Sequence, residues 1–302
     1  MSAATLRTVY SPIAGRARLE PPAGTRIIVH VIVNVEEWRF DQPMPRTAIS
    51  PPQGGAYVPD VPNWAWGEYG MRVGFWRFLD VLNAHGVKCT LSINANVCNV
   101  YPQIVKACVD ADWEMMGHSF YQRPLMMEQD ERGVIRKTLD VIQEKTGLRP
   151  RGWLGPGLGE TFDTPDYLAA EGLEYVCDWG PMDDQPVDIS TEHGSLVAVP
   201  YPIEMNDIVI YVMDRHASDE LYERGRRQFD WLYKESASNV RVMSIAIHPY
   251  VSGVPHRIAS LERLLAHMAG HEGVAFMKAG QILDWYRGAR ARLSPPEGLR
   301  SG

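Results

Sequence analysis

The sequence predicts one α/β domain built on a parallel sheet or barrel. Residues 27–35 read IIVHVIVNV, a nearly continuous run of β-branched side chains that is typical of a strand covered on both faces. After residue 69, strand patterns alternate with helix patterns, which is the organisation of parallel sheets and barrels. Several of these strands end at a charged or histidine side chain, at the edge where barrels place their active sites.

The alternation after residue 69 predicts each element in turn. Helices are expected over residues 71–85, 102–111, 130–146 and 164–171, and strands over residues 88–93, 114–116, 151–154 and 174–177. Glycines end the first and third of these helices, and Pro165 suits the first turn of the fourth. Short strands and turns are expected over residues 180–214, followed by a helix over 219–236, a strand over 240–247, and helices over 258–268 and 279–292.

No linker or internal repeat divides the chain, so we expect a single catalytic domain over residues 26–293. Residues 1–25, rich in Pro, Ala, Gly and Arg, are interpreted as an N-terminal arm, and residues 294–302 as a C-terminal tail. Residues 41–69 form a long, proline-rich connection that carries several aromatic side chains. Because long loops in compact domains tend to be functional, this connection is a candidate part of the site.

Composition and charge exclude several classes of partner. The formal net charge is −7 and Lys and Arg form no strong cluster, so no nucleic-acid partner is expected. No apolar stretch reaches the length of a membrane span, and the first residues lack the apolar core of a secretory signal. The four cysteines lack CxxC spacing and are expected to be buried thiols in a reducing compartment, so a cytoplasmic location is predicted.

The strand ends supply candidate catalytic groups. Glu36 and Glu37 directly follow the strand over residues 27–35, where a buried carboxylate is costly unless it has a function. Later strands deliver His118, Asp178 and His248. A carboxylate in this position can act as a general base on water, and a histidine, which titrates near neutrality, can protonate a leaving nitrogen.

Other motifs give weaker signals. The turn GPGLGE at residues 155–160 lacks the third glycine of a dinucleotide-binding loop, and the sequence contains neither a P-loop nor a GxSxG turn. His267 and His271 have the four-residue spacing of a helical metal-binding pair. For these two histidines a solvated helix face is the preferred interpretation.

Together, these motifs resemble the polysaccharide deacetylase superfamily with NodB homology, over residues 27–286. The first motif of that family, a strand followed by two acidic residues, is matched by NVEEW at residues 34–38. The third motif is loosely matched by Arg151 and the GPG turn, the fourth by Asp178 with Trp179, and the fifth by His248. The resemblance implies a distorted (β/α) barrel with fewer than eight parallel strands.

The resemblance also places Glu36 at the position of the catalytic base and Glu37 at that of a metal ligand. The second motif of the family has two histidines four residues apart, but here residues 118–122 read HSFYQ. Neutral glutamine is a poor zinc ligand, so the replacement puts metal binding in question. If a metal is bound, Glu37, His118 and Gln122 are its expected ligands. The sequence leaves open whether the protein needs no cofactor or one divalent metal such as zinc.

Several stretches are similar to one branch of this superfamily, which contains the metal-independent bacterial allantoinase and cyclic imide hydrolases. They are VPDVPNWAWGEYGMRVGFW, GPGLGETFDTPDYLAAEGLEYVCDWGPMDDQP and VPYPIEMNDI. This similarity implies hydrolysis of a C–N bond in a small cyclic amide, imide or ureide, and a homo-oligomer such as a tetramer. The alternatives are an N-deacetylase of an acetylated sugar or small amide, and a catalytically silent protein that binds a small ligand.

The expected mechanism assigns water activation to Glu36 and protonation of the leaving nitrogen to His248, which Asp178 positions. Glu37 and His118 hold the water or the oxyanion, directly or through a metal. A backbone amide of the turn that contains Gly155 and Gly157 donates to the oxyanion. The pocket is completed by aromatic walls and polar contacts, namely Trp64, Trp66, Trp179, Asp184 and Asn206.

Overall fold

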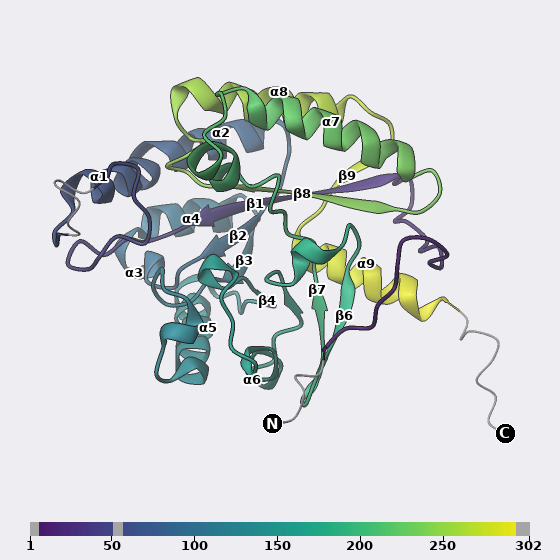
Figure 1. The fold of residues 1–302 in the computed structure, drawn as a ribbon, viewed down its shortest axis with the longest axis horizontal. Helices are drawn as coiled ribbons and strands as arrows, with labels where there is room; N and C mark the ends of the chain where they lie inside the picture. The colour runs from purple at the N-terminus through teal and green to yellow at the C-terminus, as the bar shows by residue number, and fades with distance from the viewer. Residues whose placement is uncertain (1–5, 51–56, 294–302) are drawn as a thin grey trace.

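A computed structural model describes residues 6–50 and 57–293 of the protein. The predicted tail, residues 294–302, lies outside the described residues. One sheet forms the centre of the molecule (Figure 1). Its strands are β1 (Ile27–Val35), β2 (Thr90–Ile93), β3 (Glu114–Gly117), β4 (Gly152–Trp153), β5 (Tyr175–Val176), β6 (Val187–Thr191), β7 (Gly194–Ala198), β8 (Arg241–Ile247) and β9 (Val274–Phe276).

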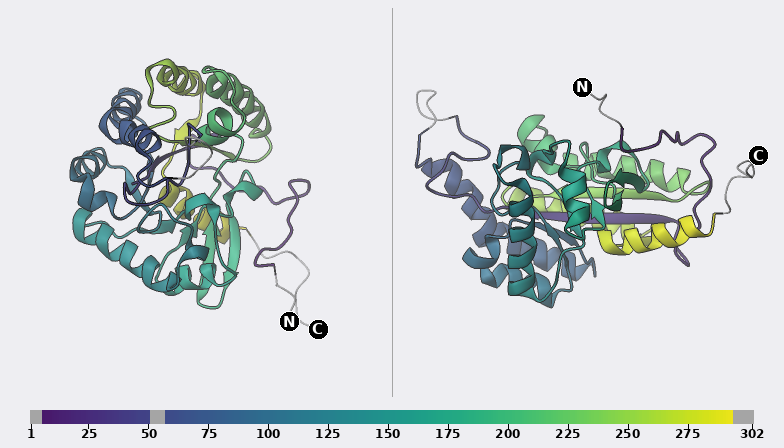
Figure 2. Two further views of the ribbon diagram at one scale, coloured as in Figure 1. Left: turned by 60° about the vertical axis from the view of Figure 1, so that its left-hand side comes forward. Right: turned by 90° about the horizontal axis from the view of Figure 1, so that it is seen from below.

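Helices surround this sheet and fill the connections between its strands (Figure 2). They are α1 (Val61–Tyr69), α2 (Phe75–Ala84), α3 (Val97–Val100), α4 (Pro102–Asp110), α5 (Glu131–Thr146), α6 (Thr164–Ala170), α7 (Glu220–Glu235), α8 (Pro255–Ala269) and α9 (Ala279–Ala291). In the part of the chain that the structure describes, no helix has both the length and the apolar character needed to cross a bilayer.

The sheet is curved into a distorted barrel. Among the described strands its order is β6-β7-β5-β4-β3-β2-β1-β8, and β9 pairs with the start of β1. The seven strands from β7 to β8 along this path are parallel, and only β6 is antiparallel to its neighbour. Asn206 forms a parallel bridge with Ala246, so the segment after β7 reaches the far edge of the sheet. The predicted barrel is confirmed, with seven parallel strands on the path and β9 as a short addition beside β1.

Alternation along the strands separates two parts of the core. Val31 of β1 packs in one buried cluster with Phe75 of α2, on the side of the outer helices. Ile32 belongs to a second cluster that also holds Tyr175 of β5 and Val242 of β8. Side chains from strands so far apart in the sheet meet on its concave face, so even-numbered residues of β1 point into the barrel.

The connection predicted over residues 41–69 contains a helix that the sequence pattern did not reveal. Helix α1 begins after Asp60, whose carboxylate accepts a hydrogen bond from the Asn63 amide at 3.2 Å. It continues through a π-helical turn, Gly70–Gly74, into α2. The predicted helix over residues 71–85 is therefore the later part of a longer helical segment, which the aromatic and glycine content of α1 disguised.

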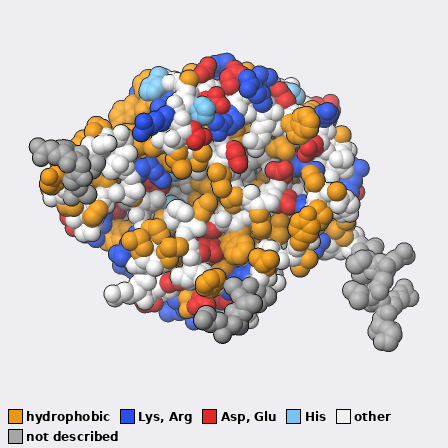
Figure 3. Space-filling model, viewed as in Figure 1, with side chains coloured by type: hydrophobic (Ala, Val, Ile, Leu, Met, Phe, Trp, Pro, Cys, Tyr) orange, Lys and Arg blue, Asp and Glu red, His pale blue; other side chains and the backbone are white. Residues whose placement is uncertain are grey.

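The described part of the N-terminal arm lies against the barrel. Arg7 forms an ion pair with Asp166 of α6 at 2.6 Å. The backbone N–H of Leu19, a buried residue, donates to Asn239 at 3.1 Å. All four cysteines are buried and free, as predicted. On the face shown in Figure 3, Lys and Arg side chains are interspersed with Asp and Glu.

Candidate active site

Four strands deliver a polar side chain to the inner side of the barrel at its carboxyl edge. These side chains are Glu36 after β1, Asn94 after β2, His118 after β3 and His248 after β8. Each continues the even-numbered, inward-facing set of its strand. Glu36, His118 and His248 are 5%, 3% and 4% exposed, so the cluster is enclosed by protein.

Glu36 is the centre of this cluster. Its Oε1 accepts a hydrogen bond from Gln122 Nε2 at 2.8 Å. Its Oε2 accepts hydrogen bonds from the Tyr250 hydroxyl at 2.8 Å and from Trp38 Nε1 at 3.2 Å. A guanidinium nitrogen of Arg46 lies 3.7 Å from the same oxygen. Four groups therefore hold the carboxylate in one orientation.

His248 links Glu36 to a second buried carboxylate. Its Nε2 lies 3.5 Å from Glu36 Oε1, and its Nδ1 lies 2.7 Å from Oδ1 of Asp207. The other oxygen of Asp207 accepts the backbone N–H of His248 at 2.8 Å. The sequence predicts this positioning role for Asp178, but in the structure the role falls to Asp207, which is fully buried.

Mutual electrostatics set the charges of this pair. Burial alone would raise the pKa of Glu36, but its hydrogen bond to His248 and the nearby positive charges reverse this and hold that pKa well below its usual range. Burial alone would lower the pKa of His248, but Asp207 and then Glu36 raise it to about 9. At neutral pH the site therefore holds a carboxylate base beside a protonated imidazole.

His118 is a neutral imidazole with one free nitrogen. Its Nδ1 donates to the Leu154 carbonyl at 2.5 Å, which leaves the lone pair on Nε2. That Nε2 is buried and has no hydrogen-bond partner among the described residues. Burial lowers the pKa of His118 to about 4, and the charge of Glu36 opposes this shift only in part. His118 can thus accept a hydrogen bond from a water or a substrate N–H.

Glu37 faces away from this cluster, because neighbouring residues at the end of a strand point to opposite sides. Its backbone N–H donates to the Asn94 side chain at 3.0 Å, and its carboxyl group interacts with Asn96 and Arg39. Burial raises the pKa of Glu37. The predicted metal ligand therefore lies on the other side of the chain from His118.

The residues at this site do not fit the divalent metal that the family resemblance implies. Gln122 turns its N–H group towards Glu36, and its carbonyl oxygen accepts from Asn94 at 3.1 Å. An amide N–H is not a metal ligand, so of the predicted ligands Glu37, His118 and Gln122, only His118 offers a free donor atom towards Glu36. The positive charges of His248 and Arg46 occupy the position beside Glu36 that a cation would need.

A cover of aromatic and basic side chains closes the cluster. The hydroxyl of Tyr250 accepts a hydrogen bond from Arg46 at 2.6 Å while it donates to Glu36. Trp66 donates from Nε1 to the Tyr250 carbonyl at 3.0 Å, and the rings of Trp38, Trp66 and Tyr250 pack edge to face. Trp66, predicted as a pocket wall, thus packs within this cover. Tyr250, Arg46 and Asn94 were not among the predicted site residues.

Asp178 and its neighbours form a separate part of the rim, next to the Leu154 carbonyl that His118 contacts. The Gly155 amide donates to Asp178 Oδ1 at 2.7 Å, and Trp179 donates to Glu160 at 2.8 Å. The Gly155 amide, predicted as an oxyanion donor, therefore already has an acceptor. Burial, and then the charge of Glu160, raises the pKa of Asp178 well above its usual range. Gly157 has the positive φ of 65° that this tight turn requires.

The structure does not gather all of the remaining predicted pocket residues. Trp64 packs against Phe40 with ring centroids 4.9 Å apart. Asn206 donates to the Tyr201 hydroxyl at 3.3 Å, beside β8. The backbone carbonyl of Asp184 accepts a hydrogen bond from the Val242 N–H at the start of β8. This is the opposite end of the strand from His248, so Asp184 does not join the cluster.

A hollow of about 540 Å³ beside the start of α5 is lined by Met127, Asp130 and Lys137 and not by Glu36. The chemically distinctive groups therefore lie in the enclosed cluster, whereas this hollow is a surface feature. The enclosed cluster is the better candidate for catalysis, because it combines perturbed pKa values with a fixed hydrogen-bond geometry.

Comparison with known proteins agrees with this fold. Residues 68–176 match the family model described as polysaccharide deacetylase. A peptidoglycan deacetylase of Helicobacter pylori is 24% identical over an alignment of 264 positions that covers 76% of this chain and 89% of the relative. The crystal structure of PuuE allantoinase superposes on this chain with a TM-score of 0.79 and 25% sequence identity. The superposition covers 91% of this chain and 95% of the allantoinase chain.

The fold and these similarities support an enzyme class, the deacetylase-type hydrolases of C–N bonds. Over residues 68–176 the chain matches a polysaccharide deacetylase domain, and its fold is like that of NodB-type neighbours, as the sequence resemblance implied. Its relatives carry the names of both deacetylases and an allantoinase, so the comparisons leave the substrate open.

Proposed function

We propose that this protein hydrolyses a C–N bond in a small cyclic amide, imide or ureide. The observation that carries the proposal is the enclosure of Glu36, His118 and His248, each at most 5% exposed, beneath Arg46 and Tyr250. A polymer needs an open groove, whereas a small planar ring fits in an enclosed site with aromatic walls. The similarity to the PuuE allantoinase structure supports the same substrate class.

In the proposed reaction, Glu36 removes a proton from water as the water oxygen attacks the ring carbonyl carbon. The ring C–N bond then breaks, and the leaving nitrogen takes the proton on Nε2 of His248. Glu36 Oε1 lies 3.5 Å from that nitrogen, so the proton gained from water can return directly to His248. The net change is the addition of one water, and both groups regain their starting charges.

The groups around this pair position the reactants. Asp207 fixes the His248 ring and stabilises its positive charge. The free Nε2 of His118 accepts a hydrogen bond from the attacking water, and Arg46 donates to a substrate carbonyl when it leaves Tyr250. Loss of the Arg46 charge from Glu36 at that step makes Glu36 a stronger base.

The second candidate is N-deacetylation of an acetylated sugar, which the peptidoglycan deacetylase relative favours by name. The same Glu36 and His248 chemistry serves an acyclic amide, so the catalytic groups do not separate the two reactions. The products separate them, because ring opening gives a single product one water heavier, whereas deacetylation releases acetate.

The substrate test is mass spectrometry of a panel incubated with the protein, with and without a chelator. The panel contains allantoin, hydantoin, dihydrouracil, succinimide, glutarimide and an N-acetylated sugar. A ring compound that gains one water, at a rate the chelator does not change, is the expected result. Acetate from the sugar with all rings intact would replace the proposal with the deacetylase function.

A matched pair of variants tests the catalytic assignment. Glu36→Gln removes the base and should lower turnover by about 10²- to 10⁴-fold while the protein stays folded. Glu37→Gln changes the neighbouring carboxyl group, which faces away from the cluster, and should keep activity within about threefold of wild type. Equal losses in the two variants would contradict the assignment of Glu36.

A further inference from the structure

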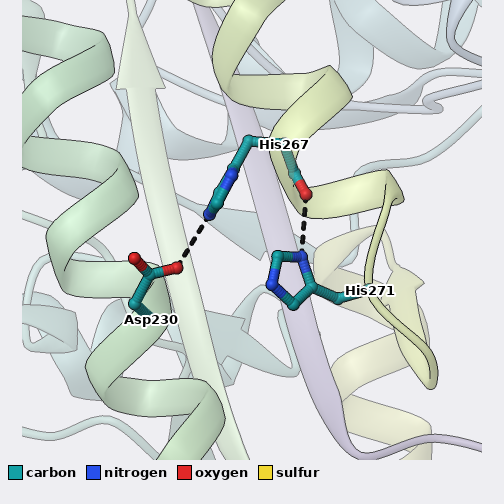
Figure 4. Close-up of side chains that lie close together, drawn as sticks. All are labelled: Asp230, His267 and His271. Atoms are coloured by element: carbon teal, nitrogen blue, oxygen red, sulfur yellow. Dashed lines mark hydrogen bonds and ion pairs between the residues drawn. The ribbon is translucent and has the colours of Figure 1, made fainter.

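A cluster of metal-binding side chains lies on the outside of the barrel, between α7 and the end of α8. The cluster consists of Asp230 on α7, His267 on α8, and His271, which lies just after the end of α8 (Figure 4). Each of the three offers a ligand atom, and these atoms all lie within 4.8 Å of one another. None of the three contributes to the candidate active site, so the cluster needs a separate explanation.

We infer that Asp230, His267 and His271 form a site for a divalent transition metal, with zinc as the best match. Two imidazoles and one carboxylate are a donor set that zinc prefers, and three protein ligands with one water complete a tetrahedron. Calcium and magnesium prefer oxygen ligands, so the two histidines select against them. The inference is independent of the proposed function.

The hydrogen bonds of the cluster already orient its ligands. Nδ1 of His271 donates to the His267 carbonyl at 2.8 Å, so the proton lies on Nδ1 and Nε2 keeps the lone pair. In Figure 4 the second ring nitrogen of His271 lies on the side of Asp230 and His267. Backbone carbonyls commonly orient metal-binding imidazoles in this way.

The shift needed to bind a metal is small. His267 Nε2 now lies 2.7 Å from Asp230 Oδ1, the distance of a hydrogen bond. Ligands about 2.0–2.1 Å from a tetrahedral zinc lie roughly 3.3 Å from one another. The Asp230–His267 contact must therefore open by about half an ångström as the metal replaces its proton, and rotation of exposed side chains can provide that movement.

The surroundings leave the site open to solvent and limit the movement of its ligands. The side chains of Asp230 and His267 are 42% and 23% exposed, which gives a metal an open path. Phe229 packs edge to face against both histidine rings and limits their rotation. Arg226 contacts the other oxygen of Asp230 at 3.4 Å and leaves Oδ1 for the metal. A bound ion would join α7, which follows Asp207 in the chain, to α8, which follows His248.

The test is a titration of the metal-free full-length protein with zinc, in competition with a chromophoric chelator. We expect one equivalent to bind. His271→Gln should weaken binding by at least about 100-fold, because outer-shell changes alone weaken metal sites 10- to 100-fold. His256→Gln, at an exposed position in the first turn of α8, is the matched control and should bind like wild type.

A second measurement ties binding to these helices. Zinc at about 100 times its Kd should raise the melting temperature by roughly 5 °C in wild type and in His256→Gln, and not in His271→Gln. The His118→Gln variant should keep the high-affinity equivalent, since His118 lies in the candidate active site. Binding that is lost with His118→Gln, or kept in His271→Gln, would overturn the inference.

Discussion

Asp207 holds His248 through two bonds at once, one from the imidazole Nδ1 at 2.7 Å and one from the backbone N–H at 2.8 Å. Two contacts to one carboxylate fix both the position of the chain and the orientation of the ring. They also direct the proton on Nε2 towards Glu36, which lies 3.5 Å away. The relationship explains how a histidine with 4% exposure stays protonated at neutral pH.

We predict that Asp207→Asn lowers turnover by about 10²- to 10⁴-fold and moves the alkaline limb of the pH profile downwards. The charge of Asp207 is the largest cause that raises the pKa of His248, so this pKa should fall from about 9 towards 6.5 or below. The measurement is kcat against pH, with an NMR titration of the imidazole. A purely structural role for Asp207 would lower activity without moving the limb.

The same pKa predicts a dependence of stability on pH. Because the pKa of His248 is raised in the folded state to about 9, its contribution is fully present below about pH 6.5 and is lost as the pH rises through 9. Comparing the urea unfolding of wild type and Asp207→Asn at pH 6.5 and at pH 9.5 isolates this contribution. The difference in unfolding free energy between the two proteins should shrink at the higher pH.

Arg46→Gln should shift the acid limb of the kcat/KM profile upwards. The Arg46 guanidinium lies 3.7 Å from Glu36 and helps to hold the pKa of that carboxyl group below its usual range, so its removal raises this pKa. Arg39→Gln is the matched control, because Arg39 is paired with exposed Asp41. An equal shift in both variants would show that the effect comes from net charge and not from the contact with Glu36.

Asp178 provides a test of a protonated carboxyl group at the rim. Burial, and then the charge of Glu160, raises the pKa of Asp178 well above its usual range, which favours the protonated form that can donate a hydrogen bond. Asp178→Asn keeps a donor and the contact with Gly155, and should retain activity within about tenfold. Asp178→Leu removes the donor and should cost about 10²- to 10³-fold. The comparison of kcat for the two variants decides, and similar losses would refute a donor role.

Much of the fold could be predicted because the signals are local. The β-branched run of β1 and the strand–helix alternation are visible without a structure, and polar residues at the strand ends identify Glu36, His118 and His248. The distinction between Glu36 and Glu37 was also available in principle. Period-two alternation from inward-facing Ile32 assigns the even-numbered residue to the barrel interior. The family pattern of an acidic pair obscured that signal.

The remaining site residues depend on how loops cross the barrel, which no local pattern specifies. Asp207 follows a turn after β7 and reaches His248 only because its segment returns to β8. Arg46 comes from the connection between β1 and α1 and contacts Tyr250, more than 200 positions away in the chain. Asp184 is the opposite case. As a polar residue in a turn it is predicted to line the pocket, but it lies at the start of β8, the end of the strand far from His248.

The π-helical turn Gly70–Gly74 packs closely against the loop after β8 that carries His248 and Tyr250, and this contact gives the last prediction. A Cβ atom at Gly74 would lie 2.0 Å from the carbonyl oxygen of Pro249, the residue between His248 and Tyr250. Gly74→Ala should therefore push this loop outwards, lower stability by about 1–3 kcal/mol and reduce kcat. Gly288→Ala is the control, since a Cβ there would meet its nearest neighbour at 3.9 Å and alanine favours a helix. Urea unfolding and kcat of both variants are the measurements. A kcat that stays at the wild-type level in folded Gly74→Ala would mean that the position of the His248 loop does not depend on this contact.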